Sequence, residues 1–222
     1  MLKIKIDDMG SGVFFTSDLH FRHGNIIKYC DRPFVSVQEQ TEKLIENWNK
    51  TVPDTATVFI LGDFAFANKN QWRGVLNQLT GRKYLILGNH DRHSDIPEEE
   101  FEEIADLATV VIKIKENEYK TFILSHRPIL CWEGSNDGSI MLYGHVHTCP
   151  NPEVEATIDS ELIKFMPKNS WDVGVDNNNY KPISIEEVLE QIENKIMSTR
   201  AHIRIMDSSG VIMLYHHCDG YP

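Results

Sequence analysis

The sequence is poor in the features that mark membrane, secreted and duplex-binding proteins. It contains no apolar run near the ~18 residues that a membrane-spanning helix needs. The N-terminal segment alternates charged and apolar side chains and lacks the apolar core of a signal peptide, so we expect a cytoplasmic protein. Four cysteines occur, none in a C-x-x-C pair, and we expect free thiols. Acidic residues outnumber basic ones 33 to 22, and the resulting net charge of −11 argues against broad binding to duplex nucleic acid.

No internal repeat and no Gly/Ser-rich linker divides the sequence, so we expect one domain over residues 1–222. Short apolar runs alternate with amphipathic segments, which predicts a layered α/β architecture with sheet between helices. Several of the runs are apolar throughout, as is typical of strands covered on both faces. The predicted strands are residues 13–16, 57–61, 84–87, 110–114, 121–124 and 140–143.

Helices are predicted where a capping pattern precedes apolar residues at helical spacing. Ser36 and Glu39 form such a capping box, and Ser184 with Glu187 repeats it. Two further helices are predicted, at residues 72–79 and from residue 97 to residue 104. Residues 201–216 have the pattern of a β-hairpin with a short turn, and we expect it to join the edge of the main sheet.

Five of the apolar runs end in clusters of aspartate, asparagine or histidine. A single aspartate after a strand is more often a turn residue or a helix cap than a ligand. Five such clusters, three of them directly preceded by glycine, are hard to explain by capping alone. Because ligands collect outside the carboxyl ends of strands, we expect the clusters to converge on one cleft. Their members are Asp18, His20, Asp63, Asn89, His90, Asp91, His126, His145 and His147.

The residue types in these clusters indicate a metal site. Carboxylate, imidazole and amide oxygen ligands without thiolate suit Mn, Fe, Zn or Co. Seven of these nine side chains acting as ligands would be too many for one ion and natural for two ions that share a bridging carboxylate. Two ions about 3.5–4 Å apart can hold a bridging hydroxide and clamp the attacking and leaving oxygens of a displacement at phosphorus. The sequence therefore predicts a two-metal hydrolase of phosphate esters.

The same motifs, in the same order, resemble the calcineurin-like metallophosphoesterase superfamily. They are Asp18-x-His20, Gly62-Asp63, Gly88-Asn89-His90-Asp91, His126 and Gly144-His145-x-His147. Flanking residues 15–21, 25–27, 32–34 and 174–176 are similar to small stand-alone phosphoesterases of bacteria and phages. The resemblance implies an α/β fold, a four-layer α/β/β/α sandwich of two mixed sheets flanked by helices. It also implies two divalent ions, Mn first, with Fe, Zn, Ni, Co or Mg as alternatives.

The resemblance further implies a role for each matching residue. Asp18, His20 and His147 would hold the first ion. Asp63 would bridge to the second ion, which Asn89, His126 and His145 would complete. His90 would face the substrate and protonate the leaving oxygen, and Asp91 would orient His90 and favour its protonated form.

Three further residues are candidate substrate contacts. His23 either faces the substrate phosphate or is a simple loop histidine. Arg22 stands where similar proteins often carry glycine, and we favour a solvated side chain over a phosphate contact. Arg127 is a candidate only because it follows His126. Asp172 and Asp176 are interpreted as hydrogen-bonding residues of turns and strand ends rather than as metal ligands.

The sequence leaves three functions open. The first is hydrolysis of phosphodiesters, in particular small nucleotides or diesters derived from nucleic acid. The second is phosphomonoesterase or protein phosphatase activity on another phosphate-ester substrate. The third is a non-catalytic metal-binding scaffold, which is disfavoured because every motif position is filled. No membrane partner is expected.

Overall fold

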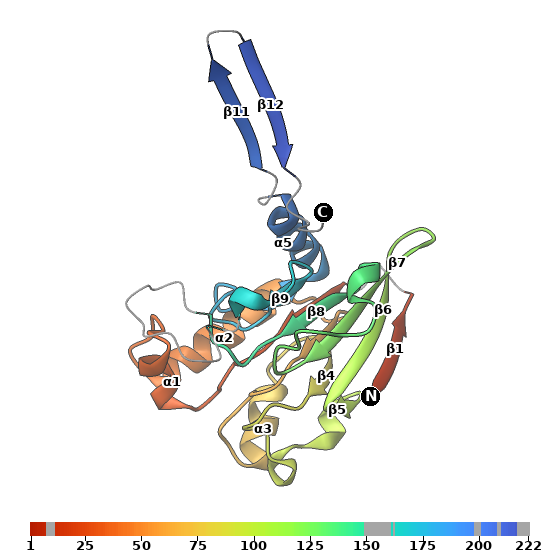
Figure 1. Ribbon diagram of the computed structural model, residues 1–222. Coiled ribbons are helices and arrows are strands. Elements are labelled where there is room, and N and C mark those ends of the chain that lie inside the picture. Colours follow the sequence, from red (N-terminus) through yellow and green to blue (C-terminus); the bar gives the residue numbers. More distant parts are fainter. Residues whose placement is uncertain (8–11, 149–160, 162, 198–200, 208–209, 217–222) are drawn as a thin grey trace.

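The computed structural model describes residues 1–7, 12–148, 161, 163–197, 201–207 and 210–216, the last two ranges by their backbone alone. Two five-stranded mixed sheets face each other, in the strand orders β1-β6-β7-β8-β9 and β10-β2-β3-β4-β5 (Figure 1). The first sheet contains β1 (Leu2–Ile6), β6 (Leu107–Lys115), β7 (Glu118–Ser125), β8 (Ile140–Tyr143) and β9 (Ser170–Asp172). The second contains β2 (Val13–Thr16), β3 (Thr57–Ile60), β4 (Arg82–Ile86), β5 (Ile104–Ala105) and β10 (Ile183–Ser184). The predicted two-sheet α/β fold is confirmed.

The central core lies between the two sheets and explains the uniformly apolar strands. Phe15 of β2 stacks on Phe59 of β3, with ring centroids 5.7 Å apart, and faces Phe122 of the opposite sheet at 5.6 Å. The neighbouring Phe14 turns to the other face of its sheet, where it joins the cluster under the helices. Both faces of β2 are therefore buried, which requires apolar residues at successive positions.

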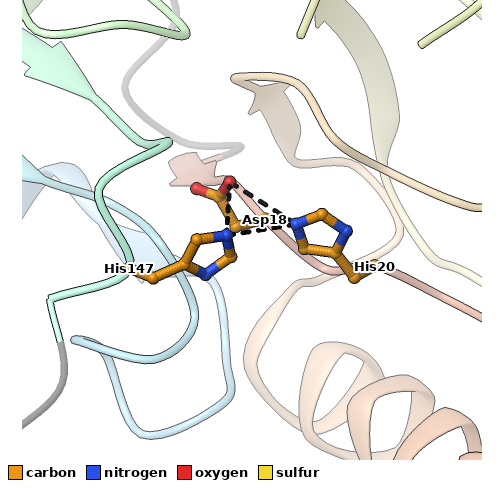
Figure 2. A group of neighbouring side chains, drawn as sticks. All are labelled: Asp18, His20 and His147. Atoms are coloured by element: carbon orange, nitrogen blue, oxygen red, sulfur yellow. Dashed lines mark hydrogen bonds and ion pairs between the residues drawn. The ribbon is translucent and has the colours of Figure 1, made fainter. Parts of the chain in front are cut away.

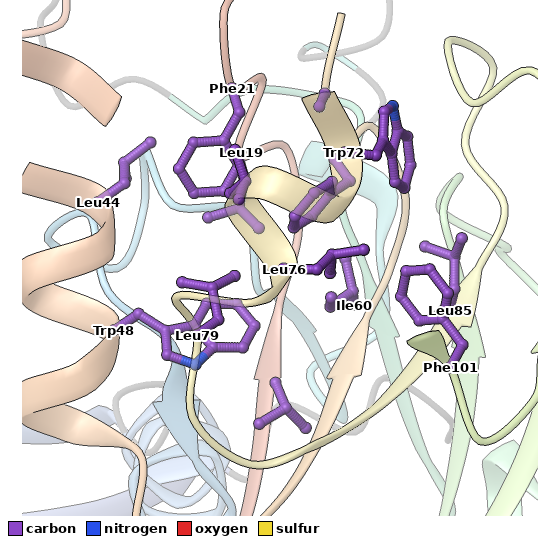
Figure 3. Packing of buried hydrophobic residues seen from close by; sticks show 14 of the residues in the cluster. Leu19, Phe21, Leu44, Trp48, Ile60, Trp72, Leu76, Leu79, Leu85 and Phe101 are labelled. Carbon is purple, nitrogen blue, oxygen red and sulfur yellow. The ribbon is translucent and has the colours of Figure 1, made fainter. Parts of the chain in front are cut away.

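Helices cover the outer face of the β2–β3–β4 sheet. They are α2 (Val37–Thr51) and α3 (Lys69–Leu76), preceded in the chain by the short helix α1 (Gly24–Tyr29), while α5 (Ile185–Met197) packs near β9 and β10. Figure 3 shows Trp48 of α2 and Trp72 of α3 packed with Leu79, Leu85 and Phe101. Both predicted helix starts are confirmed: the hydroxyl of Ser36 accepts the amide of Glu39, and that of Ser184 accepts the amide of Glu187. None of the helices in the described part of the chain is long and apolar enough to cross a membrane.

Two predicted elements differ in the structure. The helix expected over residues 97–104 is a single 3₁₀ turn, Glu98–Glu100, followed by the short strand β5. Here the backbone of Ile104 and Ala105 completes the edge of the sheet beside β4, and this pairing outweighs the local helical pattern.

The other outer face of the fold, over β7 and β8, is covered by an apolar cluster that includes Trp132 and Ile163.

The predicted C-terminal hairpin forms, but it does not join the main sheet. Strands β11 (Ala201–Asp207) and β12 (Gly210–His216) pair only with each other, as a separate two-stranded sheet. Figure 1 shows this hairpin projecting beyond the end of α5.

Candidate metal centre

The expected ligands lie on tight loops that follow the carboxyl ends of the strands. Five of these residues have a left-handed backbone, which is unfavourable for non-glycine residues and concentrates at functional sites. Backbone hydrogen bonds hold the loops against each other: the amide of Asp18 donates to Gly62 O (3.0 Å), and that of His20 to Asp63 O (3.0 Å). The five are Asp18 (φ 56°), His20 (φ 48°), Asp63 (φ 52°), His145 (φ 71°) and His147 (φ 45°).

The first ligand group brings together one carboxylate and two imidazoles. Figure 2 shows Asp18 and His20, from the loop after β2, facing His147 from the loop after β8. The Nε2 atoms of the two histidines are 3.2 Å apart, and Asp18 Oδ1 lies 3.9 Å from His20 Nε2 and 3.6 Å from His147 Nε2. Asp18 is fully buried, and its Oδ1 has no hydrogen-bond partner in the described structure. A buried, unpaired carboxylate oxygen is costly unless a cation binds it.

The second ligand group contains Asp63, His126 and His145. Asp63 Oδ2 lies 3.5 Å from His126 Nε2 and 3.7 Å from Nε2 of His20 in the first group. The opposite nitrogen of His126, Nδ1, is 2.7 Å from Leu61 O and donates to it, which leaves Nε2 as the nitrogen with a free lone pair. Asn89 Oδ1 lies 3.1 Å from this Nε2. The carboxylate of Asp63 therefore lies between both groups.

Two of the glycines in the motifs are required by the close packing of this site. A Cβ atom on Gly88 would lie 2.2 Å from Asp63 Oδ1. A Cβ atom on Gly144 would lie 2.0 Å from Ser17 Oγ and 2.3 Å from Asp18 Oδ2. These glycines allow the loops after β4 and β8 to approach the carboxylates of the neighbouring loops.

The residues present fit two divalent cations. The two groups supply imidazole nitrogens, carboxylate oxygens and one amide oxygen, a donor set suited to first-row divalent metals. The orphaned oxygen of Asp18 and the carboxylate shared by both groups each provide negative charge where a cation is needed. In the described residues no lysine or arginine forms an ion pair with either carboxylate.

A buried chain of contacts holds His147 in place. Its Nδ1 donates to Asp176 Oδ2 at 2.8 Å, and Arg32 binds the same carboxylate through Nε and an Nη nitrogen, both at 2.8 Å. Arg32 also donates to the backbone oxygen of Asp18 (2.7 Å) and to that of Leu19 (3.1 Å). The arginine thus ties the first ligand loop to the residue that orients His147. Asp176 and Arg32 were not predicted to support the site.

The charges around His147 favour its protonated form. Burial alone would lower the pKa of this histidine, but the negative charge of Asp18 and the hydrogen bond to Asp176 raise the pKa to about 11. His20 differs, because burial and the positive charge of His147 hold its pKa well below the usual value. Without a bound cation the proton therefore resides on His147, whose Nε2 faces that of the neutral His20 at 3.2 Å.

Replacing Asp176 with asparagine is expected to weaken metal binding by about 10- to 100-fold, the usual effect of removing a group that orients a metal-binding histidine. The change keeps the size of the side chain but removes the negative charge between Arg32 and His147. Turnover should recover when the metal concentration is raised, which separates a positioning role from a catalytic one. Metal titration of the variant beside Asp137→Asn, a matched change at an exposed aspartate, tests this. Unchanged affinity in both variants would contradict the positioning role.

His90 lies at the site but outside both ligand groups. Its side chain is 46% exposed, and its Nε2 is 3.9 Å from Asp63 Oδ2. Its backbone amide donates to Asp63 Oδ1 at 2.9 Å, so the backbone rather than the ring fixes the residue beside the carboxylate. The imidazole is thus left accessible from solvent.

Asp91 does not have the expected role of orienting His90. Its buried carboxylate accepts the backbone amides of Asp63 (2.8 Å), Phe64 (3.1 Å) and Gly88 (2.9 Å). Burial raises the pKa of Asp91, although these hydrogen bonds partly oppose the shift. The carboxylate of Asp91 connects the loops after β3 and β4. Its role in the structure is therefore to hold these two loops together rather than to orient His90.

The three candidate substrate contacts differ in their surroundings. Arg22 is exposed and adopts φ 65°, a left-handed backbone that explains why glycine is common there in similar proteins. His23 stacks on Phe66 with centroids 3.9 Å apart, and burial lowers its pKa, which favours the neutral ring. Arg127 lies across the second ligand group, where its guanidinium contacts His145 Nε2 (2.8 Å) and Asn89 Oδ1 (3.2 Å). A cation bound by these two atoms requires Arg127 to turn outward.

The sequence and the fold are similar to those of several known proteins. The family model described as calcineurin-like phosphoesterase matches residues 12–149. An uncharacterized protein of Methanocaldococcus jannaschii is 36% identical over 191 residues, covering 84% of this chain and 95% of that protein. The Gene 66 protein of Mycobacterium phage D29 is 29% identical, covering 62% of this chain and 79% of its own length. A crystal structure of a protein of unknown function from Aquifex aeolicus, AQ665, matches with a TM-score of 0.57 and 28% identity, over 81% of this chain and 98% of that chain.

Proposed function

Because the chain belongs to the calcineurin-like phosphoesterase family, we propose that it hydrolyses phosphodiesters of small nucleotides or nucleic-acid fragments with two divalent metal ions. The observation that carries the proposal is the position of Asp63, whose carboxylate lies within 3.7 Å of ligand nitrogens in both groups. A carboxylate shared by two sites is what a two-metal hydrolase requires. Manganese is the first candidate for both ions, and the donor set also accepts other first-row metals.

Each side chain of the site has a part in this proposal. Asp18, His20 and His147 would hold one ion, Asn89, His126 and His145 the other, and Asp63 both. When bound, the two ions would supply Lewis-acid activation of a water molecule and of the phosphoryl oxygens. His90 would donate a proton to the leaving oxygen, a role suited to an accessible imidazole. Arg127, once turned away from His145, would carry positive charge toward the phosphate.

Turnover of chromogenic substrates by metal-reconstituted protein tests the proposal. We expect metal-stripped protein to be inactive and to regain hydrolysis of bis(p-nitrophenyl) phosphate when two equivalents of Mn²⁺ bind. The monoester p-nitrophenyl phosphate should be a poorer substrate under the same conditions. Faster turnover of the monoester would favour a phosphomonoesterase, and bound metal without turnover of either substrate across Mn, Ni, Co and Mg would favour a scaffold.

A further inference from the structure

A pocket opens directly beside the proposed catalytic histidine. It has a volume of about 390 Å³, within the range of roughly 300–1,000 Å³ that is common for small-molecule sites. Its lining joins the site to the loop after β3 and to α3: the residues used below are Phe66, Trp72, Asn89, His90, Arg92 and Asp95. Since Asn89 and His90 belong to both the site and the pocket, a group in the pocket would be attached to the phosphate on the His90 side.

Phe66 forms an aromatic wall of this pocket. Phe66 is 40% exposed, whereas the neighbouring phenylalanines Phe21 and Phe64 are fully buried. One face of the ring stacks on His23 at 3.9 Å and 16°, and the ring of His90 lies 4.8 Å away. The backbone amide of Phe66 donates to Phe21 O at 3.0 Å, so the loop that carries the ring is anchored. Phe66 therefore offers a fixed aromatic surface next to the reacting phosphate.

Trp72 supplies an unused hydrogen-bond donor to the same pocket. It is fully buried and lines the pocket, yet its indole Nε1 has no hydrogen-bond partner in the described structure. In the view of Figure 3 this nitrogen lies at the end of the ring away from Leu85 and Phe101. A buried indole N–H normally finds a partner.

The other tryptophans show that the unpaired donor is particular to this position. The indole of Trp48 donates to Thr80 O (3.0 Å), that of Trp132 to Ser139 Oγ (2.9 Å) and that of Trp171 to Asn178 Oδ1 (3.1 Å). An occupant of the pocket with a hydrogen-bond acceptor would give the N–H of Trp72 the partner that it lacks in the described structure.

We propose that this pocket binds the nucleobase of the leaving nucleoside, an inference that rests on the proposed phosphodiesterase function. A nucleobase has a planar face for Phe66 and ring acceptors for the N–H of Trp72. The amide of Asn89, the cation of Arg92 and the carboxylate of Asp95 add both donors and acceptors for a polar ring edge. An aliphatic leaving group would use none of these groups. A phenol ring would use only the aromatic wall.

The direction of cleavage follows from the position of His90. The bond between phosphorus and the leaving oxygen breaks, the oxygen of water joins phosphorus, and the proton from His90 goes to the leaving oxygen. The nucleoside in the pocket is then released with a free hydroxyl, and the phosphate stays with the other alcohol. Nucleosides should accordingly bind as products, without any phosphate of their own.

Binding of free nucleosides measures the pocket separately from catalysis. Calorimetric titration of the full-length, Mg²⁺-loaded protein with adenosine and with cytidine should detect binding. Phe66→Ala should weaken it about 5- to 150-fold, the effect of losing one aromatic stack on a base. Trp72→Phe keeps an aromatic ring but removes the N–H and should weaken it about 2- to 10-fold. Phe165→Ala is the control, because Phe165 is a highly exposed phenylalanine that does not line the pocket, and its binding should match the parent protein.

The outcomes separate this inference from the proposed function. Nucleoside binding that depends on Phe66, with no diester turnover, would support the pocket and contradict the phosphodiesterase. Diester turnover without nucleoside binding, or equal binding by Phe66→Ala, would overturn the pocket and leave the phosphodiesterase intact. Binding of tyrosine methyl ester as tight as that of adenosine would also overturn base recognition. If Trp72→Phe does not fold, as judged by circular dichroism, the half-exposed Phe66 still decides the question.

Discussion

Asp63→Asn is expected to reduce phosphodiester turnover to background, the largest effect of any single change at this site. In the parent protein the backbone amide of His90 donates a hydrogen bond to Asp63 Oδ1 at 2.9 Å. Asparagine has the size of aspartate, and its amide oxygen can still accept this hydrogen bond. What it removes is the negative charge that lies 3.7 Å from His20 Nε2 and 3.5 Å from His126 Nε2. Because Asp63 is buried, no other group replaces that charge.

Metal content separates this explanation from a general loss of structure. Both ions should bind more weakly to Asp63→Asn, as measured by metal analysis after dialysis, while the melting temperature of the metal-free protein stays close to that of the parent. Asp54→Asn, the same change at an exposed aspartate, should retain full activity and both ions. Near-normal turnover by Asp63→Asn, or loss of only one ion, would show that the carboxylate does not serve both groups.

The sequence predicts the sheets and the ligands because both depend on local patterns. Strands buried on two faces must be apolar at successive positions, and β2 and β3 are fully buried along their length. The polar residues that follow these strands stand out because the packing of an apolar core does not require them. Asp18 comes two residues after the end of β2, and Asp63 comes three residues after the end of β3. Because these two strands are parallel neighbours, the convergence of the two aspartates could be inferred from chain order and sheet geometry.

The contacts that support the ligands could not be predicted in the same way. Arg32 and Asp176 are 144 residues apart, and neither follows the strand pattern that marks the ligands. Only the folded chain shows that their ion pair is buried and that it ends on His147. Asp91 illustrates the converse: the resemblance implied that it orients His90, but its carboxylate turns inward to three backbone amides. The residue type at a motif position does not determine which way its side chain points.

A long-range contact also explains the helix that was wrongly predicted. The segment after Pro97 has charged and apolar residues at helical spacing, yet Ile104 pairs with Leu85 of β4 and forms part of the strand β5.

Phe66 was not identified from the sequence because one exposed aromatic residue in a loop has no periodicity to mark it. Its importance becomes visible only with His23, His90 and the pocket around it.

His90→Ala is expected to lose activity while keeping its metals, which distinguishes it from Asp63→Asn. The backbone amide that bonds to Asp63 Oδ1 remains in the variant, and the imidazole belongs to neither ligand group. Loss of a general acid should reduce kcat by about 10²- to 10⁴-fold. The neighbouring His93→Ala, at an exposed histidine in the following 3₁₀ turn, His93–Asp95, serves as the control and should be nearly unchanged.

The leaving group determines how large the loss in His90→Ala should be. p-Nitrophenolate leaves without a proton, so bis(p-nitrophenyl) phosphate should be affected least. The alkoxide of a nucleoside needs the proton, so a dinucleotide should show the full effect. An equal loss with both substrates would mean that His90 stabilises the phosphate rather than protonating the leaving oxygen. Loss of metal from the variant would mean that His90 is itself a ligand, and the exposed position of its ring beside Asp63 argues against that outcome.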